Sequence, residues 1–157
     1  MIKNKILKLK KYFLKYQIDG YIIPKNDEFF SEFDRFDRLK KISNFSGSAG
    51  LAIITKKRNY LFVDGRYTIQ AKKQAGKIFE ILDITNNPPS KVLGNIELGL
   101  DPKIFTKKTI QRLFSKKTKI KEIDDNLIDK IEKYKIVKNE KFFSLPSLVA
   151  GENKNSK

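Results

Sequence analysis

Residues Asn44–Gln74, NFSGSAGLAIITKKRNYLFVDGRYTIQAKKQ, contain the clearest structural pattern in the sequence. Two apolar runs, LAIIT at 51–55 and YLFVD at 60–64, are joined by the polar residues KKRN, which predicts a β-hairpin. Three of the chain's eight glycines lie in the loops that flank these runs, at positions 47, 50 and 65. Glycine in a loop indicates a sharp bend or the close approach of another group. The two loops are therefore the first candidates for a contact surface.

Outside the hairpin, the sequence predicts alternating helices and strands. Residues 2–17 carry apolar side chains at helical spacing, which favours an amphipathic helix lying on a sheet over a basic helix at a membrane surface. GYIIP at 20–24 predicts a strand ended by Pro24, followed by a loop and short helix over 26–43. We expect further strands at 78–84, 96–102 and 118–123, and helices at 65–76, 107–114 and 124–134, with a short helix that ends at Leu93.

This alternation predicts an α/β domain with a mixed β-sheet flanked by helices. Gly76 is a candidate helix stop, and Thr106 is a candidate cap for the helix that follows it. The last helix is expected to turn Leu127, Ile128 and Ile131 inward. From Ile136 the pattern is lost, so we expect a domain over 1–135 and a linker, or the start of a next domain, over 136–157.

Composition limits the chemistry. The 157 residues include no Cys and no His, which removes thiol chemistry, the usual zinc sites and the commonest general base. Carboxylate, Lys, Tyr or Ser chemistry and a carboxylate-bound Mg²⁺ remain for catalysis, but no spacing in the sequence signals any of them, so no catalytic residue and no metal ligand is assigned. No apolar run approaches the roughly 20 residues that span a bilayer, and the start lacks a cleavable leader pattern. The expected location is the cytoplasm, with no membrane partner.

The net charge of +16 raises the question of nucleic acid. Only five of the 34 basic residues are Arg, and the lysines are scattered along the whole chain. Arg is the preferred residue for bidentate phosphate contacts, whereas dispersed Lys mainly solubilises a surface. We therefore expect nucleic-acid binding that is weak, independent of sequence and lost near physiological salt.

The glycine loops do not fit known phosphate-binding patterns. Gly50 is followed by Leu51 where a Walker loop requires Lys, and the strand follows the glycines instead of preceding them. In VDGRY, Asp64 is placed to accept hydrogen bonds from the next turn. Asp64 and Asp101 lie at the ends of predicted strands and Asp27 lies shortly after one, which leaves a magnesium-dependent nuclease of the ribonuclease H type as an alternative.

These segments resemble the amino-terminal domain of Xaa-Pro aminopeptidases, the creatinase/prolidase amino-terminal domain. NFSGSAGLAIIT followed by LFVDGRYTIQAKKQ is similar to the family's G-F-T-G-S-A-G loop, strand and D-G-R-Y turn. Other segments agree in order: DGYIIP, SEF at Ser31–Phe33, LGLDPKIFT, DDNLIDKI and the tail FFSLPSLVAGENKNSK. The resemblance covers nearly the whole chain. It implies a mixed sheet with a ribonuclease H-like motif.

The resemblance also implies that catalysis takes place elsewhere. In the family, a carboxy-terminal pita-bread domain holds two divalent metal ions, commonly manganese, with Asp, Glu and His ligands. The family often has His two residues after the acid that matches Asp27, whereas this chain has Phe29. An isolated amino-terminal domain is accordingly expected to be inactive.

By the same resemblance, the first loop faces a partner chain or a peptide substrate, and the second turn is fixed beside it. The implied partners are a pita-bread catalytic domain, a second copy in a homodimer, and proline-containing peptides. A free-standing α/β binding module, with nucleic acid as one ligand, remains the alternative. The loop residues are Phe45, Ser46, Gly47, Ser48, Ala49 and Gly50, and the turn residues are Asp64, Gly65, Arg66 and Tyr67.

Overall fold

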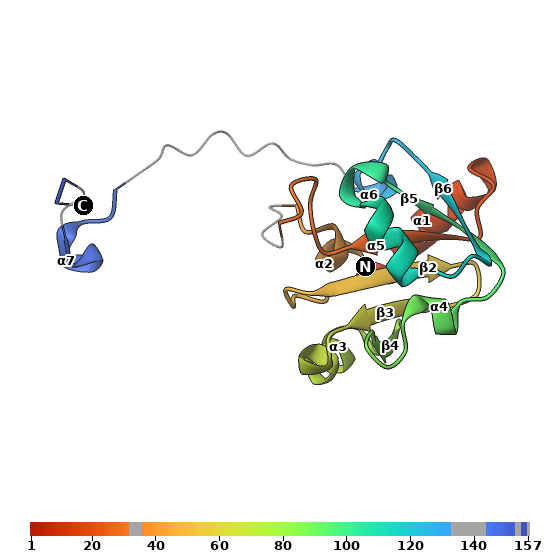
Figure 1. Ribbon diagram of the computed structural model, residues 1–157, viewed down its shortest axis with the longest axis horizontal. Coiled ribbons are helices and arrows are strands. Elements are labelled where there is room, and N and C mark those ends of the chain that lie inside the picture. The colour runs from red at the N-terminus through yellow and green to blue at the C-terminus, as the bar shows by residue number, and fades with distance from the viewer. Residues whose placement is uncertain (32–35, 133–143, 153–154, 157) are drawn as a thin grey trace.

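The computed structural model describes residues 1–31, 36–132, 144–152 and 155–156. Its centre is a six-stranded sheet in the order β4-β3-β2-β1-β5-β6 (Figure 1). The β1/β2 and β2/β3 pairs are antiparallel, and the other pairs are parallel. The strands are β1 Gly20–Pro24, β2 Gly50–Thr55, β3 Asn59–Val63, β4 Glu80–Asp83, β5 Ile96–Leu100 and β6 Thr118–Glu122.

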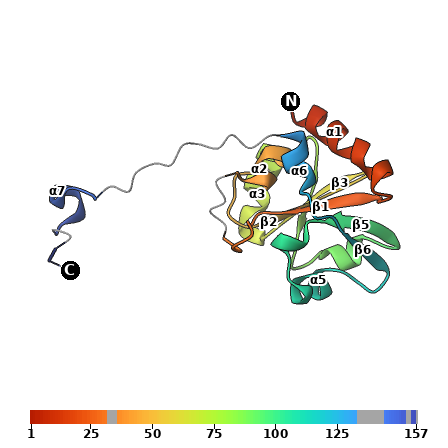
Figure 2. The same ribbon diagram turned by 90° about the horizontal axis from the view of Figure 1, so that it is seen from above.

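Helices cover both faces of this sheet, which confirms the predicted fold class. In Figure 2, α1, α2, α3 and α6 lie on one side of the sheet and α5 on the other. The α-helices are α1 Ile2–Lys15, α2 Arg38–Ser43, α3 Thr68–Ala75, α4 Pro89–Val92, α5 Lys107–Leu113, α6 Leu127–Ile131 and α7 Ser147–Ala150. Two short 3₁₀ turns, Gly65–Tyr67 and Pro102–Ile104, complete the described elements.

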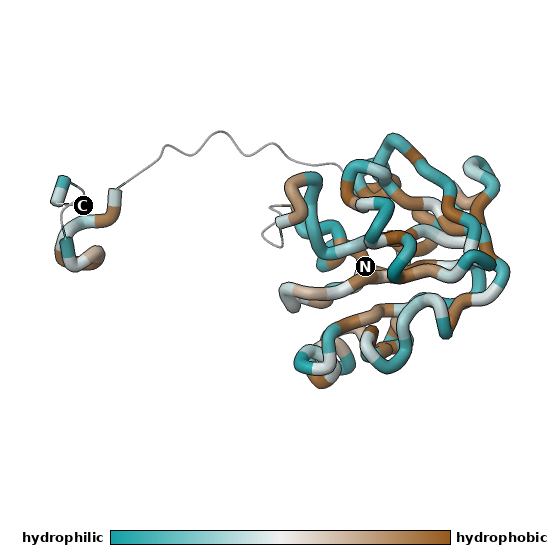
Figure 3. Tube along the Cα trace, in the orientation of Figure 1, coloured by the Kyte–Doolittle hydropathy of each residue, from teal (hydrophilic) through white to brown (hydrophobic). Residues whose placement is uncertain are grey.

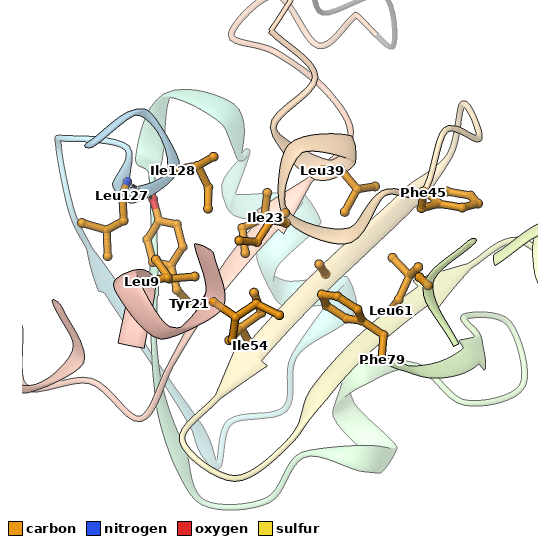
Figure 4. Close-up of a cluster of buried hydrophobic side chains, with 14 of the residues drawn as sticks. Leu9, Tyr21, Ile23, Leu39, Phe45, Ile54, Leu61, Phe79, Leu127 and Ile128 are labelled. Atoms are coloured by element: carbon orange, nitrogen blue, oxygen red, sulfur yellow. Dashed lines mark hydrogen bonds between the residues drawn. The ribbon is translucent and has the colours of Figure 1, made fainter. Parts of the chain in front are cut away.

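The central strands are apolar without interruption because both of their faces are buried. Successive side chains point to opposite faces, so Ile54 and Leu61 both lie in the larger cluster, where Figure 4 shows Ile54 near Leu9 of α1 and Leu61 near Phe45 and Phe79. Ile53 and Phe62, their neighbours in sequence, pack in a second cluster with residues around α4 and α5. The hydropathy colouring of Figure 3 follows this pattern, with brown segments along the strands.

A buried polar contact attaches α6 to the sheet. The Leu127 backbone N–H donates to the Tyr21 hydroxyl at 3.2 Å (Figure 4). Burial raises the pKa of Tyr21 well above its usual value. Nearby, the Asn126 side-chain amide nitrogen donates to Asp101 at 3.0 Å, and the side-chain oxygen Oδ1 of Asn126 accepts from Ile128 N–H. These contacts fix the end of the sheet at which β1, β5 and β6 finish.

The boundaries differ from expectation in a few places. Helix α1 ends at Lys15 because Gln17 takes a left-handed φ of 51°, which turns Ile18 into the core. The segment predicted as a helix from residue 65 starts with a 3₁₀ turn, and α3 ends before Gly76 as expected, without the left-handed conformation of a glycine cap. The short α7 was not predicted. Thr106 caps α5 by accepting from Thr109 N–H, as predicted.

Two predicted segments, the helix at 124–134 and the loop that contains residues 32 and 33, lie partly outside the described residues. Helix α6 buries Leu127 and Ile128 and half-buries Ile131, as predicted, and its expected last residues fall within 133–143. Glu32 and Phe33, which carry part of the family resemblance, also lie outside the described residues.

Candidate functional site

Strand register brings the two candidate loops to one end of the sheet. Gly50, the first residue of β2, pairs with Val63, the last residue of β3. The 44–50 loop and the 64–67 turn therefore emerge side by side. The parallel strands β1 and β5 also finish at this end, followed by Lys25 and Asp101. Lys25 N–H continues the ladder by donating to the Gly50 carbonyl at 3.0 Å.

The 44–50 loop is held by hydrogen bonds to its neighbours. Asn44 ends α2 in the left-handed conformation with φ 68°, a position that Asn tolerates better than most residues. The exposed Ser46 is clamped to α3: its N–H donates to the Gln74 side chain at 2.9 Å, and its hydroxyl accepts from Gln70 and Gln74. The loop is therefore preorganised and not a loose connection.

Phe45 lies beneath the loop instead of on its surface. Its side chain is 0% exposed, and its ring meets Tyr67 edge to face with centroids 6.0 Å apart. Of the six loop residues, Phe45 therefore acts in the core, and the surface belongs to Ser46, Ser48 and Ala49, which are exposed or half-buried. Nothing in the sequence of the loop indicated that Phe45 would be buried while its neighbours are at the surface.

The loop glycines Gly47 and Gly50 allow close packing beneath the loop. Loop glycines indicate a bend or a close approach, but among the described glycines only Gly151 has positive φ. A Cβ at Gly47 would lie 2.2 Å from the Phe45 ring, and one at Gly50 would lie 2.9 Å from Leu39. The close approach that these glycines permit is thus made by the chain's own buried ring.

The second turn is tied to the first by side chains. Asp64 accepts from Arg66 N–H at 3.0 Å and from the Arg66 Nε at 2.9 Å, and the Arg66 side chain holds the pKa of Asp64 below its usual range. Thr68 closes the turn by donating to the Gly65 carbonyl. The hydroxyls of Tyr67 and Ser48 are 2.7 Å apart and share a hydrogen bond. The Ser48–Tyr67 contact joins the two candidate segments into one surface.

The strand-end carboxylates are used locally. Asp27 closes its own turn by accepting from Phe29 and Ser31 N–H, and Asp101 accepts from Lys103 N–H and from Asn126. Together with Asp64, each of the three carboxylates therefore orders a turn. Within the described ranges there is no group of three or more His, Cys, Asp and Glu side chains placed to hold a metal ion.

The Asp27 turn presents two aromatic side chains to solvent at this end of the sheet. Phe29 is 83% exposed, and Phe30 is exposed with φ 58°. Asn26 attaches the turn to the fold by donating to the Ile104 carbonyl at 3.0 Å. The turn is thus ordered while its phenylalanines have little protein around them.

Sequence reasoning missed Gln70 and Gln74 as part of the site. Their spacing of four residues places both on one face of α3, and both reach Ser46. A polar pair at this spacing directly after the DGRY turn was the available signal. Along the described part of the chain, no helix is both long and apolar enough to cross a membrane.

The fold and the site define an α/β domain with a mixed sheet and a preformed surface of hydrogen-bonded loops at one end. The chain belongs to the creatinase/prolidase N-terminal domain family, whose model matches residues 5–131. This confirms the family that the two glycine loops indicated.

Known relatives agree with this assignment. A Laccaria bicolor protein named "Probable Xaa-Pro aminopeptidase P" is 30% identical over 140 residues, which cover 80% of this chain and 22% of that protein. The chain spans about a fifth of the length of the curated relatives that it matches.

Two solved structures share the fold. An X-prolyl aminopeptidase from Caenorhabditis elegans, described as a cytosolic enzyme with a di-nuclear active site, superposes with a TM-score of 0.71 at 24% identity, over 87% of this chain and 26% of that one. The N-terminal domain of a cytoplasmic peptidase from Mycobacterium tuberculosis gives 0.61 at 20% identity, over 82% and 98% of the chains. At these identities the likeness establishes the fold alone.

Proposed function

We propose that this chain is a non-catalytic amino-terminal domain that gates substrate entry and supports dimerisation in a cytoplasmic Xaa-Pro aminopeptidase. The metal-dependent chemistry belongs to a pita-bread catalytic domain, which would hold two divalent ions. The domain's own contribution is a wall of the partner's active site, built from the 44–50 loop and the 64–67 turn. Proline-containing peptides would pass along this wall.

The observation that carries the proposal is the Ser48–Tyr67 hydrogen bond of 2.7 Å. It joins the two segments with the strongest family resemblance, and the Ser46 contacts to α3 hold the loop in place. A surface that is ordered before it meets a partner loses little conformational freedom on binding. Such preorganisation suits a wall that must keep one shape while peptides enter and leave.

The isolated chain is expected to have no aminopeptidase activity on Xaa-Pro peptides, with or without added Mn²⁺. The chain has no His, and the strand-end carboxylates Asp27, Asp64 and Asp101 are engaged in separate turns. Hydrolysis of a fluorogenic Xaa-Pro peptide, followed across the fractions of a final size-exclusion step, checks this. Metal-dependent turnover that co-elutes with the protein would contradict the proposal that catalysis belongs to a separate domain.

Joining this domain to a pita-bread domain of the same family tests the gating role. In the joined dimer, Ser48→Trp is expected to lower kcat/KM for long peptides by roughly tenfold, about 1.4 kcal/mol of transition-state stabilisation, while dipeptides are cleaved nearly as before. The indole would narrow the path of the longer peptide without touching the metal ligands. Steady-state kinetics on peptides of graded length measure this difference.

Ser115→Trp is the matched control. Ser115 is also half-buried, but it precedes β6 and so lies at the opposite end of the sheet. The ratio of kcat/KM between the Ser115→Trp protein and the parent should be the same for long and short peptides. Equal kinetics for Ser48→Trp and the parent on long and short peptides would remove the 44–50 loop from the substrate path.

A further inference from the structure

The second feature of interest is a pocket at the other end of the sheet, away from the loops. It has a volume of about 460 Å³, within the range of small-molecule sites. The antiparallel register places it there: Gly20 pairs with Thr55 at this end of β1, whereas Pro24 pairs with Leu51 at the loop end. The hairpin between β2 and β3 forms one wall, and the segment between α4 and β5 forms the other.

Three consecutive cations form the hairpin wall: Lys56, Lys57 and Arg58. The pocket also contains one carboxylate, Asp19, which is paired with Lys56 at 2.7 Å and accepts from Glu97 N–H. The Lys56 hydrogen bond holds the pKa of Asp19 below its usual range, so this pair is internally neutral at pH 7. The uncompensated positive charge of the pocket therefore comes from the other two cations.

Both of those cations are available to a ligand. Lys57 has no ion-pair partner within the described ranges, and the Arg58 guanidinium meets Glu80 only at 3.7 Å, between side chains that are largely exposed. Glu80 is not part of the pocket lining. Thr55 orders the turn by accepting from Arg58 N–H at 2.9 Å, so the backbone that carries these side chains is fixed.

The facing wall is apolar, with backbone donors at its tip. Val92, Leu93 and Ile96 supply its apolar surface, and Tyr60 of β3 adds an aromatic ring from the hairpin side. Among the residues described, neither Gly94 N–H nor Asn95 N–H donates to another backbone or side-chain acceptor. A Cβ at Gly94 would meet nothing within 4 Å, so this part of the wall is open. The pocket therefore combines an apolar side with a cationic side.

We infer that this pocket binds a phosphate monoester with a flat apolar body, the chemistry of a nucleotide. Lys57 and Arg58 would hold the phosphate, since charge-assisted hydrogen bonds to phosphate are among the strongest in proteins. The apolar wall would cover the body of the ligand. A free nucleotide and the terminal nucleotide of an RNA strand share this chemistry, and the experiment separates the two sources.

The test titrates the full chain with AMP, with inorganic phosphate and with a short single-stranded oligouridylate carrying a terminal phosphate, at physiological salt. Amide chemical shifts in ¹H–¹⁵N spectra locate the binding. We expect saturable shifts of Lys57, Arg58, Gly94 and Asn95 with AMP or with the oligonucleotide, and weaker binding of inorganic phosphate. The probe that saturates these shifts at the lower concentration identifies the ligand class, a free nucleotide or the end of an RNA strand.

Charge reversal separates this pocket from general attraction by a basic protein. Lys57→Glu and Arg58→Glu should each weaken binding by roughly tenfold or more. Lys73→Glu makes the same change in net charge on an exposed lysine of α3, at the loop end, and should leave the affinity within about twofold. Thermal melts confirm that all three variants are folded.

Two results would overturn the inference. One is the absence of saturable shifts at the pocket with all three probes. The other is an equal loss of binding in the Lys57→Glu and Lys73→Glu proteins, which would reduce the interaction to dispersed lysines. The inference stands apart from the peptidase proposal, because the pocket and the loops lie at opposite ends of the sheet and are probed by different variants.

Discussion

The Phe45→Ala protein should unfold about 3–5 kcal/mol more easily than the parent, the range for removing a buried phenylalanine. Phe45 is 0% exposed and belongs to the larger core cluster with Leu39. Its loss also removes the edge-to-face contact with Tyr67, so the 64–67 turn loses a support. Against a total stability of about 5–15 kcal/mol for a domain, this is a severe change.

Denaturant unfolding followed by circular dichroism measures this effect, and Phe29→Ala is its matched control. The chemical change is the same, but Phe29 is 83% exposed, so its truncation should stay within about 0.5 kcal/mol. Similar midpoints for the two alanine variants would mean that Phe45 does not support the loop from below.

The Gly47→Ala protein is expected to lose about 1–3 kcal/mol of stability through overpacking. The new Cβ would lie 2.2 Å from Phe45 Cζ, 2.9 Å from Cε2 and 3.0 Å from Cε1. These three nearest atoms all belong to one ring. Leucine lacks all of them, so the cost of Gly47→Ala should largely disappear in a Phe45→Leu background.

A double-mutant cycle on these two positions measures the coupling directly. Gly94→Ala serves as the control, since a Cβ there meets nothing within 4 Å and φ is not positive. It should be neutral or slightly stabilising, because alanine restricts the unfolded chain. If Gly47→Ala cost the same with leucine as with phenylalanine at position 45, the clash with the ring would not be the reason for the glycine.

Much of the architecture was predictable from local pattern. The hairpin, the strand at Gly20–Pro24, the caps at Asp64 and Thr106 and the helix at the amino terminus all follow from side-chain period and backbone chemistry. These signals are local, because a residue and its near neighbours along the chain determine them. The family followed for the same reason: the loop and turn motifs lie within one short stretch.

Other features were missed because they depend on contacts between distant segments. Gln74 reaches Ser46 across 28 residues, and Asn26 reaches Ile104 across 78. The spacing of apolar and polar residues along the sequence contains no signal for a contact between such distant residues. The pocket is a similar case, since its two walls come from the hairpin and from the segment before β5, and only the β1/β2 and β1/β5 pairings bring them together.

Local sequence pattern was sufficient to predict which segments form strands and where the chain turns. The role of the glycines in the 44–50 loop depends on packing: Gly47 and Gly50 make room for Phe45 and Leu39, and Phe45 belongs to the core although its neighbours lie at the surface. Backbone preference depends on a residue and its near neighbours in the chain. Burial depends on the side chains from other segments that the fold packs against that residue. A Cβ that is harmless along the chain becomes costly only when a ring from the same loop occupies its place.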